Sequence, residues 1–195
     1  DVVLLYGIGD AQTAVTDKLK ELSIPYMYVG EYLEESPLGK AEWLVALAEL
    51  TDSREKGIEI FREIPKRYQV LKALTESVEQ RPTVMLNTPW NDSWVMPSTQ
   101  SYMAQLITDA GADYIYKENN SNSSTPIGLE TAYKLIQKAD YWINVGMAST
   151  LDELKTVNPK FVDAKAVREK TVYNNNLRTT PTGGNDYWES AVVRP

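Results

Sequence analysis

Short apolar runs alternate with helical patterns along this 195-residue chain, and no other feature constrains its fold as strongly. The apolar run at residues 2–6 is followed by a turn over Gly7 and Gly9 and by a helical pattern over 11–22. A second apolar run covers residues 25–29. A strand, a helix and a strand in this order form a right-handed crossover with parallel strands. Parallel sheets are covered on both faces, so the first strand is expected to be buried. The pattern predicts an α/β fold.

Two helical patterns follow this first unit. Ser36 and Pro37 begin a helix that extends to about Thr51. Asp52 and Glu55 then resemble a capping box, and they open the longest apolar periodicity of the chain, over residues 52–80. Pro65 lies inside it and predicts a kink or local break. The pattern fits either an ordinary surface helix or a long helix that joins two lobes.

The alternation resumes beyond Arg81. Strands are expected at residues 82–86, 113–116, 141–145 and 171–173, and helices at 99–110, at 129–139 and from Thr150 onward. Residues 87–97 and the polar run 118–124 are expected to be loops. The second part of the chain is therefore a further α/β unit.

The composition excludes several kinds of chemistry. The chain has no histidine and no cysteine, which rules out a Ser-His-Asp triad, a thiol nucleophile, a disulfide and the usual nitrogen and sulfur zinc sites. Its net charge of −7 argues against a nucleic-acid partner. Carboxylates remain, and Asp92, Asp186 and Glu189 lie on candidate loops, so an enzyme acting on carbohydrate is one alternative.

Loops at the carboxyl ends of parallel strands are where ligands bind in such sheets. The turn at Gly7 and Gly9 could approach a phosphate or be a plain turn. Trp90 and Trp94 lie on a loop expected to face solvent, and they suit either stacking on a bulky apolar ligand or packing. Arg178 could bind an anionic group or remain a solvated charge.

Four stretches together resemble one family. They are residues 31–43 (EYLEESPLGKAEW), 93–102 (SWVMPSTQSY), 109–111 (DAG) and 185–189 (NDYWE). In this order and spacing they resemble the helical-backbone class of substrate-binding proteins, which serve bacterial ABC importers for iron-siderophores, haem and vitamin B12. The chain departs from the family's pattern at Ser98 and Thr99, where a glycine pair is common.

The resemblance implies two α/β lobes with parallel sheets flanked by helices, joined by one long backbone helix. Residues 1–51 would be the remaining part of the first lobe, 52–80 the backbone helix and 81–195 the second lobe. It implies a monomeric binding protein that is not an enzyme, has no cofactor or metal of its own, and holds an iron chelate, haem or cobalamin between its lobes. A third alternative is an interaction domain without a small ligand, in which both tryptophans would be buried.

The resemblance also implies roles for particular residues. Tyr6, Trp90, Trp94 and Tyr187 match positions at the ligand, and Glu189 matches the second-lobe glutamate that docks onto arginines of the membrane permease. We expect the periplasm, or a lipoprotein anchor, as the location. The chain resembles a segment cut at both ends, with an incomplete first lobe and with the first-lobe docking glutamate upstream of Asp1. We therefore expect the isolated chain to bind its ligand weakly.

Overall fold

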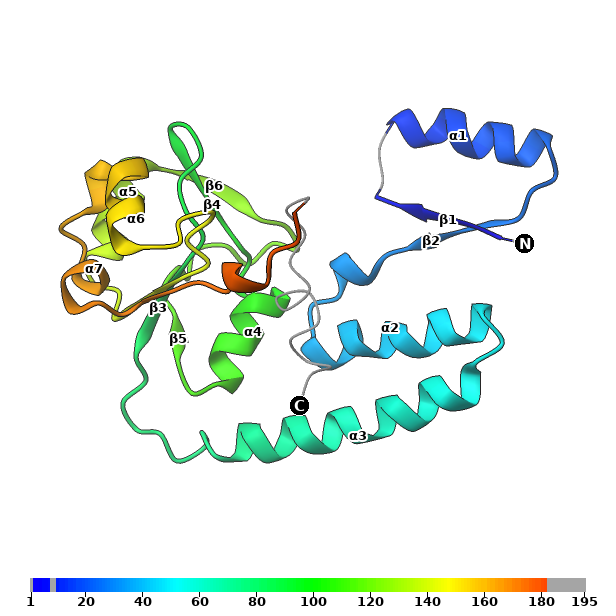
Figure 1. The fold of residues 1–195 in the computed structure, drawn as a ribbon, viewed down its shortest axis with the longest axis horizontal. Coiled ribbons are helices and arrows are strands. Elements are labelled where there is room, and N and C mark those ends of the chain that lie inside the picture. Colours follow the sequence, from blue (N-terminus) through cyan, green and yellow to red (C-terminus); the bar gives the residue numbers. More distant parts are fainter. Residues whose placement is uncertain (1, 8–9, 182–195) are drawn as a thin grey trace. The chain divides into compact units, whose positions relative to one another are not determined.

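The computed structural model describes residues 2–7 and 10–181, and the chain divides into two compact units, Asp1–Glu34 and Glu35–Pro195. In the first unit, β1 (Val3–Tyr6) and β2 (Tyr26–Val29) pair in parallel and are connected by α1 (Asp10–Glu21) (Figure 1). A 3₁₀ turn, Glu31–Leu33, follows β2. The predicted strand-helix-strand unit with parallel strands is confirmed.

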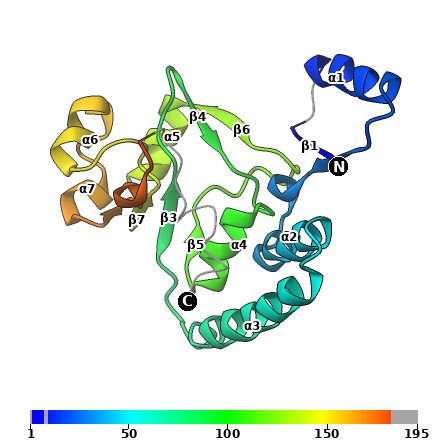
Figure 2. The same ribbon diagram turned by 45° about the vertical axis from the view of Figure 1, so that its right-hand side comes forward.

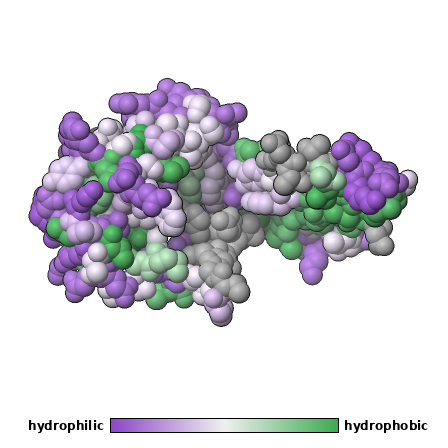
Figure 3. Space-filling view, turned by 90° about the horizontal axis from the view of Figure 1, so that it is seen from above, coloured by the Kyte–Doolittle hydropathy of each residue, from purple (hydrophilic) through white to green (hydrophobic). Residues whose placement is uncertain are grey.

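The prediction that the first strand is buried is wrong. Along β1, half-buried Val3 and Leu5 alternate with exposed Leu4 and Tyr6. An alternation of period two is typical of a strand with one covered face. Among the described residues of the first unit, this sheet has two strands and is accompanied by the single helix α1. One helix can cover only one face of the sheet. On the face drawn in Figure 3, hydrophobic residues (green) form one broad patch at the right of the view and are scattered among hydrophilic ones (purple) at the left.

The second unit begins with two helices, α2 (Pro37–Leu50) and α3 (Arg54–Ala73). The predicted start of α2 is confirmed, since the Ser36 hydroxyl accepts a hydrogen bond of 2.8 Å from the Gly39 amide. The capping box predicted for α3 does not form: Asp52 has a φ of 54°, and Ser53 precedes the helix without a side-chain cap. The helix continues through Pro65 and ends at Ala73, whereas residues 74–80 form turns and loop. It is therefore shorter than predicted and is not broken. Whether it joins two lobes remains a prediction.

One buried carboxylate connects α3 to α4 (Tyr102–Asp109). Asp109 accepts hydrogen bonds from the Tyr68 hydroxyl at 2.6 Å and the Gln105 amide at 2.8 Å, and pairs with Lys72 at 2.8 Å. Burial raises the pKa of Asp109, but these three donors outweigh it, so the net shift is downward. The ionised carboxylate therefore fixes α3 against α4.

A parallel four-stranded sheet forms the centre of the second unit. Its strands are β3 (Thr83–Leu86), β5 (Asp113–Tyr114), β7 (Tyr141–Ile143) and β8 (Val172–Tyr173), in the order β5-β3-β7-β8. All four predicted strands are confirmed, each shorter than expected. The helices that follow are α5 (Leu129–Ile136), α6 (Leu151–Val157) and α7 (Lys165–Glu169), with 3₁₀ turns at Pro159–Phe161 and Asn176–Arg178. Figure 2 shows α6 and α7 on one side of β3 and α4 on the other.

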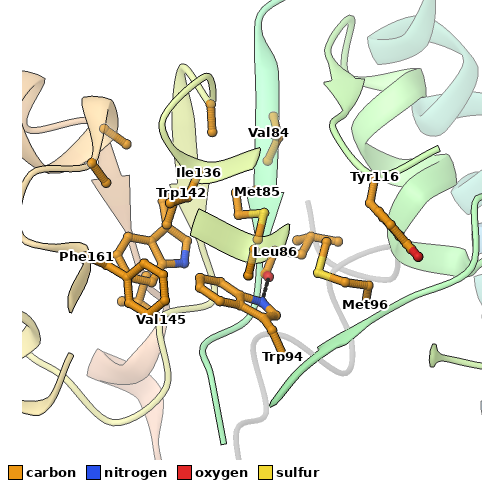
Figure 4. Packing of buried hydrophobic residues seen from close by; sticks show 14 of the residues in the cluster. Val84, Met85, Leu86, Trp94, Met96, Tyr116, Ile136, Trp142, Val145 and Phe161 are labelled. Carbon is orange, nitrogen blue, oxygen red and sulfur yellow. Dashed lines mark hydrogen bonds between the residues drawn. The ribbon is translucent and has the colours of Figure 1, made fainter. Parts of the chain in front are cut away.

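The segment 87–97, predicted to be a loop, contains a strand. β4 (Ser93–Met96) pairs antiparallel with β6 (Thr125–Gly128). This pairing places Trp94 in the core, fully buried, with its indole N–H donating to the Leu86 carbonyl at 2.7 Å (Figure 4). Its ring lies 5.2 Å from Phe161 and 5.6 Å from Trp142. The prediction that Trp94 contacts a ligand is therefore wrong, because the ring has no exposed surface to offer.

At the amino end of β7, Asp140 makes a testable contribution to stability. Its carboxylate accepts from the Thr83 amide at 2.7 Å and pairs with Lys165, which holds its pKa at about 2. A lowered pKa stabilises the fold above the unfolded value of about 4, and this contribution is lost as the pH falls from 4 toward 2. The carboxylate is one-third exposed, so solvent screening reduces the ion-pair part. We expect Asp140→Ala to lower the free energy of unfolding by about 1–2 kcal/mol at neutral pH.

Urea unfolding at pH 7 and at pH 2.5 measures this contribution. The difference between the variant and the unmodified chain should shrink at the lower pH. Glu130→Ala is the matched control, because its pair with Lys134 is exposed and should contribute nothing measurable. An equal loss of stability for the Asp140 variant at both pH values would contradict the assignment.

Candidate functional site

The strand order of the second unit changes direction between β3 and β7. From β3 the chain moves to β5 on one side, and it then returns to β7 on the other side of β3. The loops after Leu86 and Ile143 therefore diverge at the carboxyl edge of the sheet. Ligands of open α/β sheets bind at such a point.

Two asparagines occupy the first positions beyond these strands. Asn87 and Asn144 have φ values of 68° and 59°, a left-handed conformation that asparagine tolerates better than most residues. The Asn144 side-chain amide donates to the Asn87 side-chain oxygen at 2.8 Å, and Asn87 donates to the Val95 carbonyl at 3.0 Å. The Trp142 indole N–H also donates to the Asn87 carbonyl, at 2.6 Å. These bonds fix both loops to the core.

Beyond Asn87 the chain turns back and exposes Trp90. Backbone bonds between Trp90 and Ser93, of 2.9 and 3.2 Å, close the turn, and Asn91 within it has a φ of 54°. The Trp90 side chain is 76% exposed. A large apolar ring is thus held at the carboxyl edge on a constrained turn, where it can stack on a ligand.

The loops after β7 and β8 are joined by further asparagine amides. Asn174 donates to the carbonyls of Gly146 and Ala148 at 2.7 and 3.1 Å, and Asn176 donates to Ala148 at 3.0 Å. A recess of about 260 Å³ lies beside them. It is lined by Val145, Ala148, Ser149, Thr150, Leu151, Leu154, Val172, Asn174, Asn176 and Leu177. Apolar side chains and neutral amides therefore share this edge.

The predicted site residues belong to both units of the chain. Trp90 lies at the carboxyl edge of the four-stranded sheet, and Tyr6 ends β1 in the first unit, where it is 64% exposed and lies 5.0 Å from the Tyr32 ring. The backbone of Arg178 ends the 3₁₀ turn after β8, but its side chain lies outside the described part of the chain. Tyr187 and Glu189 also lie outside it.

The alternatives left open by the sequence can now be compared. Of the three candidate catalytic carboxylates, the structure describes Asp92, which is exposed in the turn beside Trp90, while Asp186 and Glu189 fall outside the described residues. An interaction domain without a ligand predicts that both tryptophans are buried, and the exposure of Trp90 disagrees with it. No role for Asn87, Asn144 or Asn174 was predicted from the sequence, although their positions directly after strands were a usable signal.

Two properties of residues 2–7 and 10–181 bear on what the chain can do. Within these ranges, three or more Asp or Glu side chains do not gather where they could hold a metal ion. In the same ranges, every helix is too short or too polar to span a bilayer.

The chain is similar to two lipoproteins of Methanocaldococcus jannaschii. The uncharacterized lipoprotein MJ0878 is 27% identical over 196 residues, which cover 99% of this chain and 44% of that protein. The uncharacterized lipoprotein MJ0872 is 27% identical over 182 residues, or 89% of this chain and 46% of that protein. The chain thus spans less than half the length of these relatives.

Solved structures share the fold at low sequence identity. The periplasmic haem-binding protein HutB of Vibrio cholerae superposes with a TM-score of 0.69 at 13% identity, over 97% of this chain and 74% of that one. An ABC transporter substrate-binding protein from Listeria monocytogenes gives 0.65 at 12% identity, over 97% and 73%. At these identities the likeness shows the α/β fold alone.

A family model described as "Periplasmic binding protein" matches residues 1–176. That family consists of transport components that are not enzymes, in agreement with the resemblance noted from the sequence motifs. Since the match covers most of its length, the chain belongs to the periplasmic binding protein family.

Proposed function

We propose that this chain acts in the substrate-binding component of an ABC importer and captures an iron chelate, haem or cobalamin for a membrane permease. The observation that carries the proposal is the exposed Trp90, held by a constrained turn at the carboxyl edge where the strand order changes. The turn constrains the backbone at Trp90, so part of the conformational freedom that ligand binding would remove is already lost.

The ligand class and the location draw on the similar proteins. HutB is described as haem-binding, and both M. jannaschii relatives are described as lipoproteins. On this basis we propose a location outside the cytoplasm, in a periplasm or anchored to the membrane surface.

We propose roles for four further residues, three of them on the strength of their matching positions and Arg178 because its guanidinium can bind an anionic group. Tyr6 and Tyr187 would contact the ligand, and Arg178 would contact an anionic group on it. Glu189 would dock onto arginines of the permease, where a carboxylate would guide association and fix the orientation of the complex. Trp94 is excluded from this set because it is buried.

Replacement of Trp90 tests the proposal. Isothermal titration calorimetry of the 195-residue chain with haemin, cyanocobalamin and a ferric siderophore should detect binding of at least one of these three ligands. Trp90→Ala should weaken that binding about tenfold or more, because a stacking ring is lost, while Trp90→Phe retains most of it. Leu74→Ala is the matched control, since Leu74 is 71% exposed but lies just beyond α3.

Thermal unfolding of each variant checks that the fold is unchanged. The proposal fails if none of the three ligands binds, or if the Trp90→Ala variant binds as tightly as the unmodified chain.

A further inference from the structure

The loops that follow the four parallel strands of the second unit carry almost no net charge. We call residues 87–92, 115–124, 144–150 and 174–181 the carboxyl-edge loops. Their charged residues are Asp92, Glu118, Lys117 and Arg178. Two acidic and two basic residues cancel, and the other 18 of the 20 lysines and arginines lie elsewhere in the chain.

Neutral amides are concentrated in the same loops. Nine of the chain's eleven asparagines lie in the carboxyl-edge loops. Asparagines after β3, β7 and β8 connect these three loops to one another through the hydrogen bonds described above. Three large side chains are well exposed in these loops: Trp90 at 76%, Met147 at 78% and Leu177 at 95%. The edge therefore offers apolar surface supported by uncharged polar groups.

The loop after β2 in the first unit, taken by itself, also lacks positive charge. Residues 30–34, which follow β2, contain Glu31 and Glu34 and neither lysine nor arginine. The chain as a whole carries a net charge of −7, which disfavours the approach of anions at long range.

Iron chelates, haem and corrinoids differ in the charge on their outer surface. This charge determines which of them the carboxyl-edge loops can bind favourably. A tricatecholate iron complex and the carboxylates of haemin lose hydration on binding, and they need lysine or arginine partners in return. A neutral trihydroxamate iron complex or a corrinoid presents amide and apolar groups instead, which match asparagine amides and exposed apolar rings.

We propose that the carboxyl-edge loops select a bulky ligand whose exterior carries no net negative charge and displays amide and apolar groups. This inference rests on the proposed function and narrows its ligand class. A hydroxamate chelate and a corrinoid share the recognised chemistry, so the experiment must distinguish the two.

Calorimetric titrations of the 195-residue chain with four probes make the test. The neutral probes are a ferric trihydroxamate and cyanocobalamin, and the anionic probes are a ferric tricatecholate and haemin. We expect one neutral probe to bind at least about tenfold more tightly than either anionic probe, with an affinity that changes less than about twofold between low and high salt. Which neutral probe binds identifies the source of the ligand.

The failures are distinguishable. If an anionic probe binds as tightly as the neutral ones, the inference is wrong and the proposed function stands. If no probe binds, the proposed function itself fails, and the inference falls with it.

An added positive charge provides a second test. Met147→Arg places a cation on an exposed side chain of the carboxyl-edge loops, so it should strengthen binding of the anionic probes about tenfold at low salt. Leu74→Arg adds the same charge outside these loops, so it is the matched control and should leave the affinity for the anionic probes unchanged. If the Met147→Arg variant binds the anionic probes no more tightly than the unmodified chain, a shortage of positive charge in these loops is not what disfavours anionic ligands, and the inference is overturned.

Discussion

Replacing Trp94 with alanine is expected to lower the free energy of unfolding of the second unit by about 3–5 kcal/mol. The ring is fully buried and packs against Trp142 and Phe161, and its N–H bonds to the Leu86 carbonyl. The substitution removes this packing, leaves a cavity and deprives a buried carbonyl of its donor. Urea unfolding followed by far-ultraviolet circular dichroism measures the change.

Trp90→Ala is the control for this prediction. The two tryptophans are four residues apart, but Trp90 is 76% exposed, so its loss should change stability by less than about 0.5 kcal/mol. Equal losses of stability in the two variants would contradict the separation of a core tryptophan from a surface one.

Replacing Gly57 with leucine is expected to lower the free energy of unfolding by about 2–3 kcal/mol. Gly57 is buried in α3, and a Cβ added to it would lie 2.5 Å from the Ala48 Cβ of α2. Any side chain here must push the two helices apart. Replacing glycine with alanine inside a helix ordinarily raises the free energy of unfolding by about 1 kcal/mol. A decrease on Gly57→Ala would therefore indicate the close approach of α2 and α3.

Exchanging Gly57 and Ala48 tests whether a steric clash between α2 and α3 causes the loss of stability. Gly57→Ala alone should destabilise, and combining it with Ala48→Gly should recover part of the loss because the clash is removed. If Gly57→Ala stabilises the chain as an ordinary helical substitution would, the close approach of α2 and α3 is not present in solution.

Local patterns were enough to predict most of the fold. The strands of both parallel sheets and the starts of α2 and α6 follow from apolar runs and capping residues, and the Thr150 hydroxyl does accept from the Glu153 amide. Boundaries were less accurate. Asp52 suits a helix cap chemically, yet it takes a left-handed turn conformation and leaves that position to Ser53.

The role of Trp94 could not be predicted because it depends on a distant partner. β4 pairs with β6, about 30 residues further along, and Pro126 within β6 made that segment a poor strand candidate. In the structure Trp94 and Met96 are buried on either side of exposed Val95, but all three residues are apolar, so the sequence itself has no period-two pattern there.

The asparagines of the candidate site show the same limit. Their concentration after strands is visible in the sequence, but the bond between Asn87 and Asn144 joins segments that only the sheet order brings together.

Hydrogen exchange of the 195-residue chain, with and without a saturating neutral chelate, tests the central claim most directly. We expect added protection of residues 87–92 and 144–150, because these loops would contact the ligand around Trp90. Protection confined to the opposite edge of the sheet, around Thr83, Asp140 and Lys165, would contradict a binding site at the carboxyl edge.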